Sequence, residues 1–164
     1  MSKLLKKTVE YLIKGSDTRC VFSIPGDLWP VEVDDTQMGY AIKNLIINAK
    51  DAMPRDGVIN IGAENMAEDT QKKILPLPIR EKDLIKITIQ DHGIGIPEQN
   101  LSSIFDPYFT TKQMGTQKGM GLGLSLAHSI IRKHGGVIEV ESKEGVGTIV
   151  EIYLPARPTK RSLS

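Results

Sequence analysis

This chain of 164 residues has one cysteine, no long apolar run and almost no net charge. Its one cysteine, Cys20, excludes an internal disulfide framework and a cysteine-clustered metal site, and fits a reducing compartment. No apolar run reaches the roughly 20 residues of a membrane span, and the N-terminus lacks a signal-peptide core. The formal net charge of +1 gives no field that favours nucleic acid or an anionic membrane as a partner. We therefore expect a soluble, cytoplasmic domain, while a membrane anchor elsewhere in a parent protein stays open.

Length and composition favour one domain. A hydrophobic content of 40% is enough to bury one sizeable core in a chain of this length. We expect this domain to span residues 1–156. The polar segment 157–164 is typical of a linker or tail.

Hydrophobic spacing and turn residues predict an α+β fold. Helices are expected over 2–13 with a cap at Ser2, from a cap at Asp34 or Asp35 to Met53, and over 124–134. Strands are expected over 20–24, 31–33, 58–63, 83–90, 137–141 and 148–154, with a long loop or partly helical insertion over 65–82. These elements predict a two-layer sandwich, in which three main helices pack on one face of a mixed, mostly antiparallel sheet of about five strands.

The second expected helix carries a polar stripe. At about 100° per residue, Asn44, Asn48 and Asp51 fall along the edge of an apolar arc. Short oxygen-bearing side chains in that alignment can face one cavity, and the amide oxygen of Asn48 suits magnesium that arrives with nucleotide phosphates. An isolated pair of asparagines would more often be solvated surface residues, so this interpretation depends on the other polar segments.

A loop rich in glycine follows the strand at 83–90. It begins at Asp91 and continues through Gly93 and Gly95, which permit positive φ angles and close approach of the backbone to a flat ring. A buried carboxylate at Asp91 can accept a hydrogen bond from the exocyclic amine of adenine, which guanine does not offer at that position. An ordinary Asx turn is the alternative interpretation.

A second glycine segment, 119–124, leads directly into the last expected helix. Its backbone N–H groups and the helix N-terminus can bind phosphate oxygens. Neither a P-loop nor a dinucleotide fingerprint fits, because no GKS or GKT follows and the helix is not part of a βαβ unit. The polar stretch before Gly119 suits a lid over a triphosphate, with Lys112 or Lys118 supplying positive charge. Phe105 would anchor the base of that lid, and plain core packing is equally compatible with it.

In this order and spacing, the segments resemble the ATP-binding catalytic domain of two-component sensor histidine kinases, within the superfamily of gyrase, heat-shock chaperone, histidine kinase and mismatch-repair ATPases. The likeness covers an N box at 44–52, glycine boxes at 91–96 and 119–124, an F box at 105–112 and a terminal element at 145–148. The wording Asn-Ala-Lys-Asp-Ala-Met and Phe-Thr-Thr-Lys is similar to nitrogen-sensor-type and hybrid kinases in particular.

The resemblance implies a Bergerat-type ATP-binding sandwich that binds Mg-ATP and presents its γ-phosphoryl group to a histidine on a separate dimerisation domain, upstream of a response regulator. By the same resemblance Asn48 holds magnesium and Asp91 binds adenine, and the expected catalytic residues are Asn44 and Lys112. The expected nucleotide-binding residues are Asn44, Asn48, Asp51, Asp91, Gly93, Gly95, Ile96, Phe105, Lys112, Lys118, Gly119, Gly121, Leu122, Gly123, Leu124 and Thr148.

The chain departs from a complete kinase because it has no H box. None of its histidines lies in a sequence like that of a phosphoacceptor, so the chain resembles a catalytic domain without its own substrate. ATP-hydrolysing relatives place a glutamate four residues before the metal asparagine, where this chain has Asn44. Without that base a water nucleophile is poorly activated, which favours transfer to an imidazole that is already nucleophilic near neutral pH. A serine-kinase relative and a nucleotide-binding module without chemistry stay open as alternatives.

Overall fold

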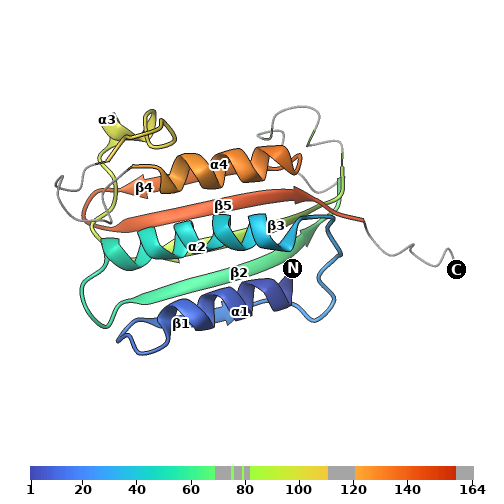
Figure 1. Ribbon diagram of the computed structural model, residues 1–164, viewed down its shortest axis with the longest axis horizontal. Helices are drawn as coiled ribbons and strands as arrows, with labels where there is room; N and C mark the ends of the chain where they lie inside the picture. The colour runs from blue at the N-terminus through green and yellow to red at the C-terminus, as the bar shows by residue number, and fades with distance from the viewer. Residues whose placement is uncertain (69–74, 76–78, 80–81, 111–120, 158–164) are drawn as a thin grey trace, which may run out of the picture.

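The computed structural model describes residues 1–68, 75, 79, 82–110 and 121–157. In this part of the chain, five strands form one sheet and three long helices cover one of its faces (Figure 1). The helices are α1 (Ser2–Ile13), α2 (Asp35–Ala52) and α4 (Gly123–Lys133), with a four-residue helix α3 (Glu98–Leu101) after the third strand. The strands are β1 (Arg19–Ser23), β2 (Val58–Met66), β3 (Leu84–Asp91), β4 (Val137–Lys143) and β5 (Gly147–Pro155).

The sheet is mixed, as predicted. Its strand order is β1-β2-β3-β5-β4, with β1 and β2 parallel and the other neighbours antiparallel. Asp91 of β3 lies opposite Thr148 of β5, which lies opposite Ser142 of β4. Directly opposed residues project from the same face of a sheet. Three polar side chains therefore form one row across the end of three adjacent strands.

The core lies between the sheet and the helices. The strand alternation that fills it also explains why the Asp91 end of the polar row is buried. Ile85, Ile87 and Ile89 alternate along β3 and are at most 1% exposed, each contributing roughly 1.5–3 kcal/mol through burial. α2 packs between α1 and α4 (Figure 1). Asp91 continues the alternation of the three isoleucines, so the same strand that fills the core also buries this carboxylate.

The helix N-termini agree with the sequence in one case and differ in another. Asp34 caps α2, because its Oδ1 accepts a hydrogen bond of 2.8 Å from the amide of Gln37. The prediction that Ser2 caps α1 is wrong. Ser2 is already helical and Met1 occupies the N-cap position, where its carbonyl accepts from the amide of Leu5 at 3.0 Å.

The expected strand at 31–33 is also wrong. Val31 makes only an isolated antiparallel bridge with Ala156. Pro30 has no N–H to donate, and β5 ends at Pro155, so neither side can extend the ladder.

A second apolar cluster lies on the sheet face away from the helices. Leu75 and Ile79, from the expected insertion at 65–82, are each 4% exposed and pack with Leu84 and Tyr153. Most of that insertion lies outside the described residues. Across the described chain, no helix is both long and apolar enough to cross a bilayer.

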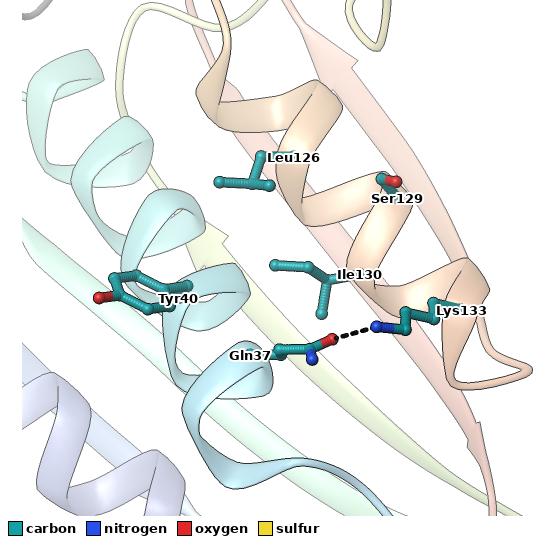
Figure 2. A pocket seen from close by; sticks show the side chains of 6 residues that line it. All are labelled: Gln37, Tyr40, Leu126, Ser129, Ile130 and Lys133. Atoms are coloured by element: carbon teal, nitrogen blue, oxygen red, sulfur yellow. Dashed lines mark hydrogen bonds between the residues drawn. The ribbon is translucent and has the colours of Figure 1, made fainter.

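α2 and α4 are joined where α4 ends and α2 begins. Nε2 of His134 accepts a hydrogen bond of 3.1 Å from the amide of Asp34, while its Nδ1 lies 2.8 Å from the carbonyl of Ile130 and donates to it. One residue earlier, Nζ of Lys133 donates to Oε1 of Gln37 at 3.2 Å (Figure 2). The two helices are thus held together at this end by side-chain hydrogen bonds.

Candidate functional site

The loop from Asp91 to Ile96, here called the Asp91 loop, is held by backbone hydrogen bonds on both sides. The amide of Ile94 donates to the carbonyl of Ala52, the last residue of α2, at 2.9 Å. The carbonyl of Ile94 accepts from the amide of Gly145, in the turn between β4 and β5, at 2.7 Å. The loop is therefore fixed between the end of α2 and the β4–β5 turn, while the Ile94 side chain is 69% exposed.

Asp91 is a buried carboxylate, 6% exposed, at the start of this loop. Burial raises the pKa of Asp91, and backbone hydrogen bonds from Gly93 and Thr148 partly offset that rise. The amide of Gly93 donates to Oδ1 at 2.9 Å, so the Asx turn that the sequence allowed is present. The Gly93 amide and burial together fix the direction of this side chain.

The glycines of the loop serve protein packing. A Cβ atom at Gly93 would lie 2.3 Å from the carbonyl oxygen of Ala52, and one at Gly95 would lie 2.1 Å from that of Lys143. Gly95 also has a φ of +69°, which favours glycine. The expectation of positive φ is confirmed at Gly95 and wrong at Gly93. At both positions the missing Cβ atom makes room for neighbouring backbone, and close approach to a flat ring stays a prediction.

The polar stripe of α2 lies where it was predicted, at the edge of the apolar arc. Asn44 and Asn48 are half-buried and Asp51 is exposed. The Asn44 amide group donates to the carbonyl of Tyr40 at 2.9 Å. A Cβ atom at Gly123 would lie 3.0 Å from Oδ1 of Asn44, so the stripe meets the first residue of α4.

The start of α4 differs from the start of α2. Its N-cap residue, Leu122, has no oxygen in its side chain, and the first turn carries no acidic residue. Gly121 precedes it with a φ of +69°, and its carbonyl accepts from the amide of Tyr108 at 3.0 Å. The first N–H groups of a helix have no partner within the helix itself, so they suit anionic oxygens.

Phe105 packs against α4. Its ring stacks on that of His128, with centroids 4.8 Å apart and an interplanar angle of 29°. Burial lowers the pKa of His128, and the nearby positive charge of Arg132 lowers it further. Phe105 and Leu124 are both partly buried against the main core, which agrees with the core-packing interpretation of Phe105.

The remaining predicted residues divide into two groups. Thr148 is 8% exposed and directly opposite Asp91, and Ile96 ends the Asp91 loop. Lys112, Lys118 and Gly119 lie outside the described residues.

One residue of this region was missed by the sequence analysis. Ser142 of β4 accepts a hydrogen bond of 2.8 Å from the amide of Ile96. It follows Ile138 and Val140 at two-residue spacing on the side of β4 that faces the core. A hydroxyl at such a position is a signal that period-2 reading of the strand could have found.

A groove of ≈ 320 Å³ lies between α2 and α4. Tyr40 of α2 lines it, and Figure 2 shows Leu126 and Ile130 pointing from α4 toward α2, with the Gln37–Lys133 hydrogen bond at one end. Among the residues that the structure describes, none of the predicted site residues lines this groove. The same part of the chain holds no group of three or more His, Cys, Asp or Glu side chains that could bind a metal ion.

Comparison with known proteins identifies a family. Residues 33–158 match the model of the histidine kinase-, DNA gyrase B- and HSP90-like ATPases. The chain is 40% identical over 141 residues to the sensor kinase CckA of Brucella abortus, covering 86% of this chain and 15% of that protein. It is 30% identical over 164 residues to the sensor histidine kinase ZraS of Escherichia coli K12, covering 98% of this chain and 31% of that protein. The chain thus spans less than a third of either relative.

A solved structure gives the same result for the fold. The catalytic domain of the histidine kinase ThkA, in a nucleotide-free form, superimposes with a TM-score of 0.73 at 30% sequence identity. The match covers 98% of this chain and 95% of that one. The α+β sandwich is therefore that of a histidine kinase catalytic domain.

Proposed function

Because this chain belongs to the family of histidine kinase-, DNA gyrase B- and HSP90-like ATPases, we propose that it binds Mg-ATP and presents the γ-phosphoryl group to a histidine on a separate helical domain. That phosphoacceptor domain and a downstream response regulator belong to the proposal, since the chain covers only part of its kinase relatives. Residues 1–156 would form the catalytic domain and 157–164 its linker, working in the cytoplasm where ATP is available.

The observation that most supports this proposal is the course of α2. Asn44 lies beside Gly123 at the start of α4, and Ala52 holds the Asp91 loop at the other end of the helix. These two points are eight residues apart, or about 12 Å along the helix axis. An extended nucleoside triphosphate can bridge that distance with its base at one end and its phosphates at the other.

Each predicted residue then has a chemical task. Asp91 accepts a hydrogen bond from the exocyclic amine of adenine, which selects adenine over guanine. The N–H groups at the start of α4 bind phosphate oxygens, and Gly121 and Gly123 line that approach. A Cβ atom at Gly121 would lie 2.5 Å from the carbonyl carbon of Tyr108, and one at Gly123 would lie 3.0 Å from Oδ1 of Asn44. Asn48 supplies a hard amide oxygen to magnesium, which when bound would neutralise phosphate charge. Lys112 or Lys118 would add charge at the γ-phosphate.

Asn44 favours a kinase over a hydrolase. It stands where hydrolysing relatives carry a glutamate base, and its amide cannot take a proton from water. Its side chain is instead used in a hydrogen bond to the Tyr40 carbonyl. Transfer to an imidazole needs no such base, because neutral imidazole is already a nucleophile near neutral pH. A serine-kinase relative and a binding module remain the competing proposals.

The test combines binding and transfer. Calorimetry should detect Mg-dependent ATP binding, and incubation with a histidine-bearing helical domain supplied separately should yield acid-labile phosphohistidine. A steady-state ATPase assay run in parallel should show turnover far slower than transfer. Hydrolysis faster than transfer would favour the hydrolase, binding without either activity would favour the module, and failure to bind ATP would contradict the proposal as a whole.

A further inference from the structure

The hydroxyl of Ser142 is surrounded by polar groups from three segments. Its Oγ accepts from the amide of Ile96 at 2.8 Å, donates to the carbonyl of Gly147 at 2.9 Å, and lies 2.8 Å from Oγ1 of Thr148. A serine hydroxyl has one donor and two acceptor sites. With Thr148 as donor to Ser142, all three sites are used. Alanine would leave the part-buried Ile96 amide without this acceptor, and cysteine would bind it weakly.

The partners of Ser142 lead directly to Asp91. The carbonyl of Gly147 and the amide of Thr148 belong to one peptide group, and Thr148 lies directly opposite Asp91 in the β3–β5 ladder. The N–H of Thr148 lowers the pKa of Asp91 and so partly offsets the rise from burial. Ser142 therefore holds one end of a peptide whose other end lies beside the Asp91 carboxylate.

The same hydroxyl holds the far end of the Asp91 loop. The loop leaves β3 at Asp91 and ends at Ile96, whose amide binds Ser142. A Cβ atom at Gly147 would lie 2.2 Å from the carbonyl oxygen of Asp91, so the backbones of β3 and β5 are in close contact here. Both ends of the Asp91 loop are thus held through one atom of β4, the Oγ of Ser142: the Ile96 end directly, and the Asp91 end through the Gly147–Thr148 peptide.

We propose that Ser142 is a positioning residue for base recognition: by holding the Gly147–Thr148 peptide and the Ile96 amide, it sets where Asp91 meets the adenine ring. This inference rests on the proposed function and adds to that site a determinant that does not itself touch the nucleotide. Its loss should affect the adenine end of the site and leave the phosphate end unchanged, because Asn44 and Gly123 share no hydrogen bond with Ser142 among the described residues.

The experiment compares Ser142→Ala with Ser142→Thr by calorimetry with ATP, adenosine and inorganic tripolyphosphate. Loss of the Ser142 hydroxyl and its hydrogen bonds should weaken adenosine and ATP binding by the same factor, about three- to tenfold, with tripolyphosphate unchanged. Ser142→Thr keeps the hydroxyl on a residue that strands favour, and should stay within about twofold of the wild type. Ser16→Ala is the matched control, because it removes a serine hydrogen bond of 2.9 Å to the Ile13 carbonyl at the end of α1.

The outcomes separate this inference from the proposed function. Unchanged adenosine affinity in Ser142→Ala, or equal losses for adenosine and tripolyphosphate, would overturn the role of Ser142 while leaving ATP binding established. A wild type that binds no ATP would contradict the proposed function itself. If Ser142→Ala does not fold, Ser142→Cys replaces it, since the thiol fills the space with weaker hydrogen bonds, and the same split between adenosine and tripolyphosphate decides.

Discussion

The two ends of the proposed nucleotide site are built in different ways. At the adenine end, backbone groups of α2, the Asp91 loop and the β4–β5 turn bind one another, and glycines admit the contacts. At the phosphate end, the described residues bring together the Asn44 side chain, Gly123 and a helix start whose N-cap residue has no capping oxygen. At the adenine end the backbone groups are bonded within the protein. At the phosphate end the first N–H groups of α4 have no capping side chain at the N-cap residue and suit a ligand. Substitutions should therefore separate adenine binding from phosphate binding.

The largest effect is expected at the phosphate end, from Asn48→Ala. Loss of the metal ligand should weaken Mg-ATP binding by ~30-fold or more, as for interactions with charged groups of about 2 kcal/mol. Adenosine affinity should stay as in the wild type. The Asn48 side chain is half-buried, so a thermal scan checks that the variant melts as the wild type does. Lys43→Ala, on the exposed side of α2, is the control. Unchanged calorimetric affinity would remove Asn48 from the site.

Asp91→Asn should have the next largest effect and act at the adenine end. Adenosine and ATP affinity should fall about tenfold, with a smaller preference for ATP over GTP, because a charged acceptor is lost. Equal losses for ATP and GTP would contradict the role given to Asp91.

The stability of the same variant should change in the opposite direction. Burial raises the pKa of Asp91, so the folded wild type holds its proton more tightly than the unfolded chain, and it loses stability as the pH rises through that folded pKa. The neutral amide of the Asp91→Asn variant has no such charge to bury. Urea unfolding should therefore find this variant at least as stable as the wild type at neutral pH, with the advantage disappearing in acid. The prediction would be contradicted if Asp91→Asn lowered the free energy of unfolding at neutral pH by more than it does in acid.

Gly123→Ala should have a smaller effect, about threefold, on ATP alone. A Cβ atom there would press on Oδ1 of Asn44 at 3.0 Å, while alanine favours the helix that begins at this residue. ATP affinity should fall without loss of adenosine affinity or of melting temperature. Gly95→Ala is the counterpart at the adenine end, where the φ of +69° and the Lys143 carbonyl predict loss of stability and of both affinities. Equal loss of adenosine binding in the two variants would remove the distinction between the ends.

The smallest expected effect concerns His128. Burial and the charge of Arg132 lower the pKa of His128 below the usual 6.5, so the folded chain binds the proton less tightly than the unfolded chain. The free energy of unfolding therefore falls as the pH falls through 6.5. His128→Phe keeps a ring against Phe105 and removes the titrating group. Its urea midpoint should drop less than that of the wild type between about pH 7.5 and about pH 5.5. Identical drops would show that His128 does not contribute.

Much of the fold could be predicted because its signals are local. The alternation that buries Ile85, Ile87 and Ile89 predicts β3, and the side chain of Asp34 predicts the start of α2. The strand expected at 31–33 failed because its pairing depends on where β5 ends, which is a long-range fact. Local apolar alternation cannot supply that information.

The site divides along the same line. Asp91 and Asn44 could be proposed as site residues because they stand at the end of a strand and along a helix edge. Ser142 could not be assigned a task from sequence, since its partners Ile96 and Gly147 meet it only once β4, β5 and the Asp91 loop are assembled. The reason for Gly93 and Gly95 was likewise hidden, because the carbonyls that face them come from Ala52 and Lys143, distant in sequence.

The contact between His134 and Asp34 has a mechanical consequence. It joins the C-terminal end of α4 to the N-terminal end of α2. Asn44, in the middle of α2, lies beside Gly123 at the opposite end of α4. The described side-chain hydrogen bonds between the two helices lie at this end. A ligand or larger side chain inserted beside Gly123 would therefore be expected to displace the first turn of α4 more than its last turn.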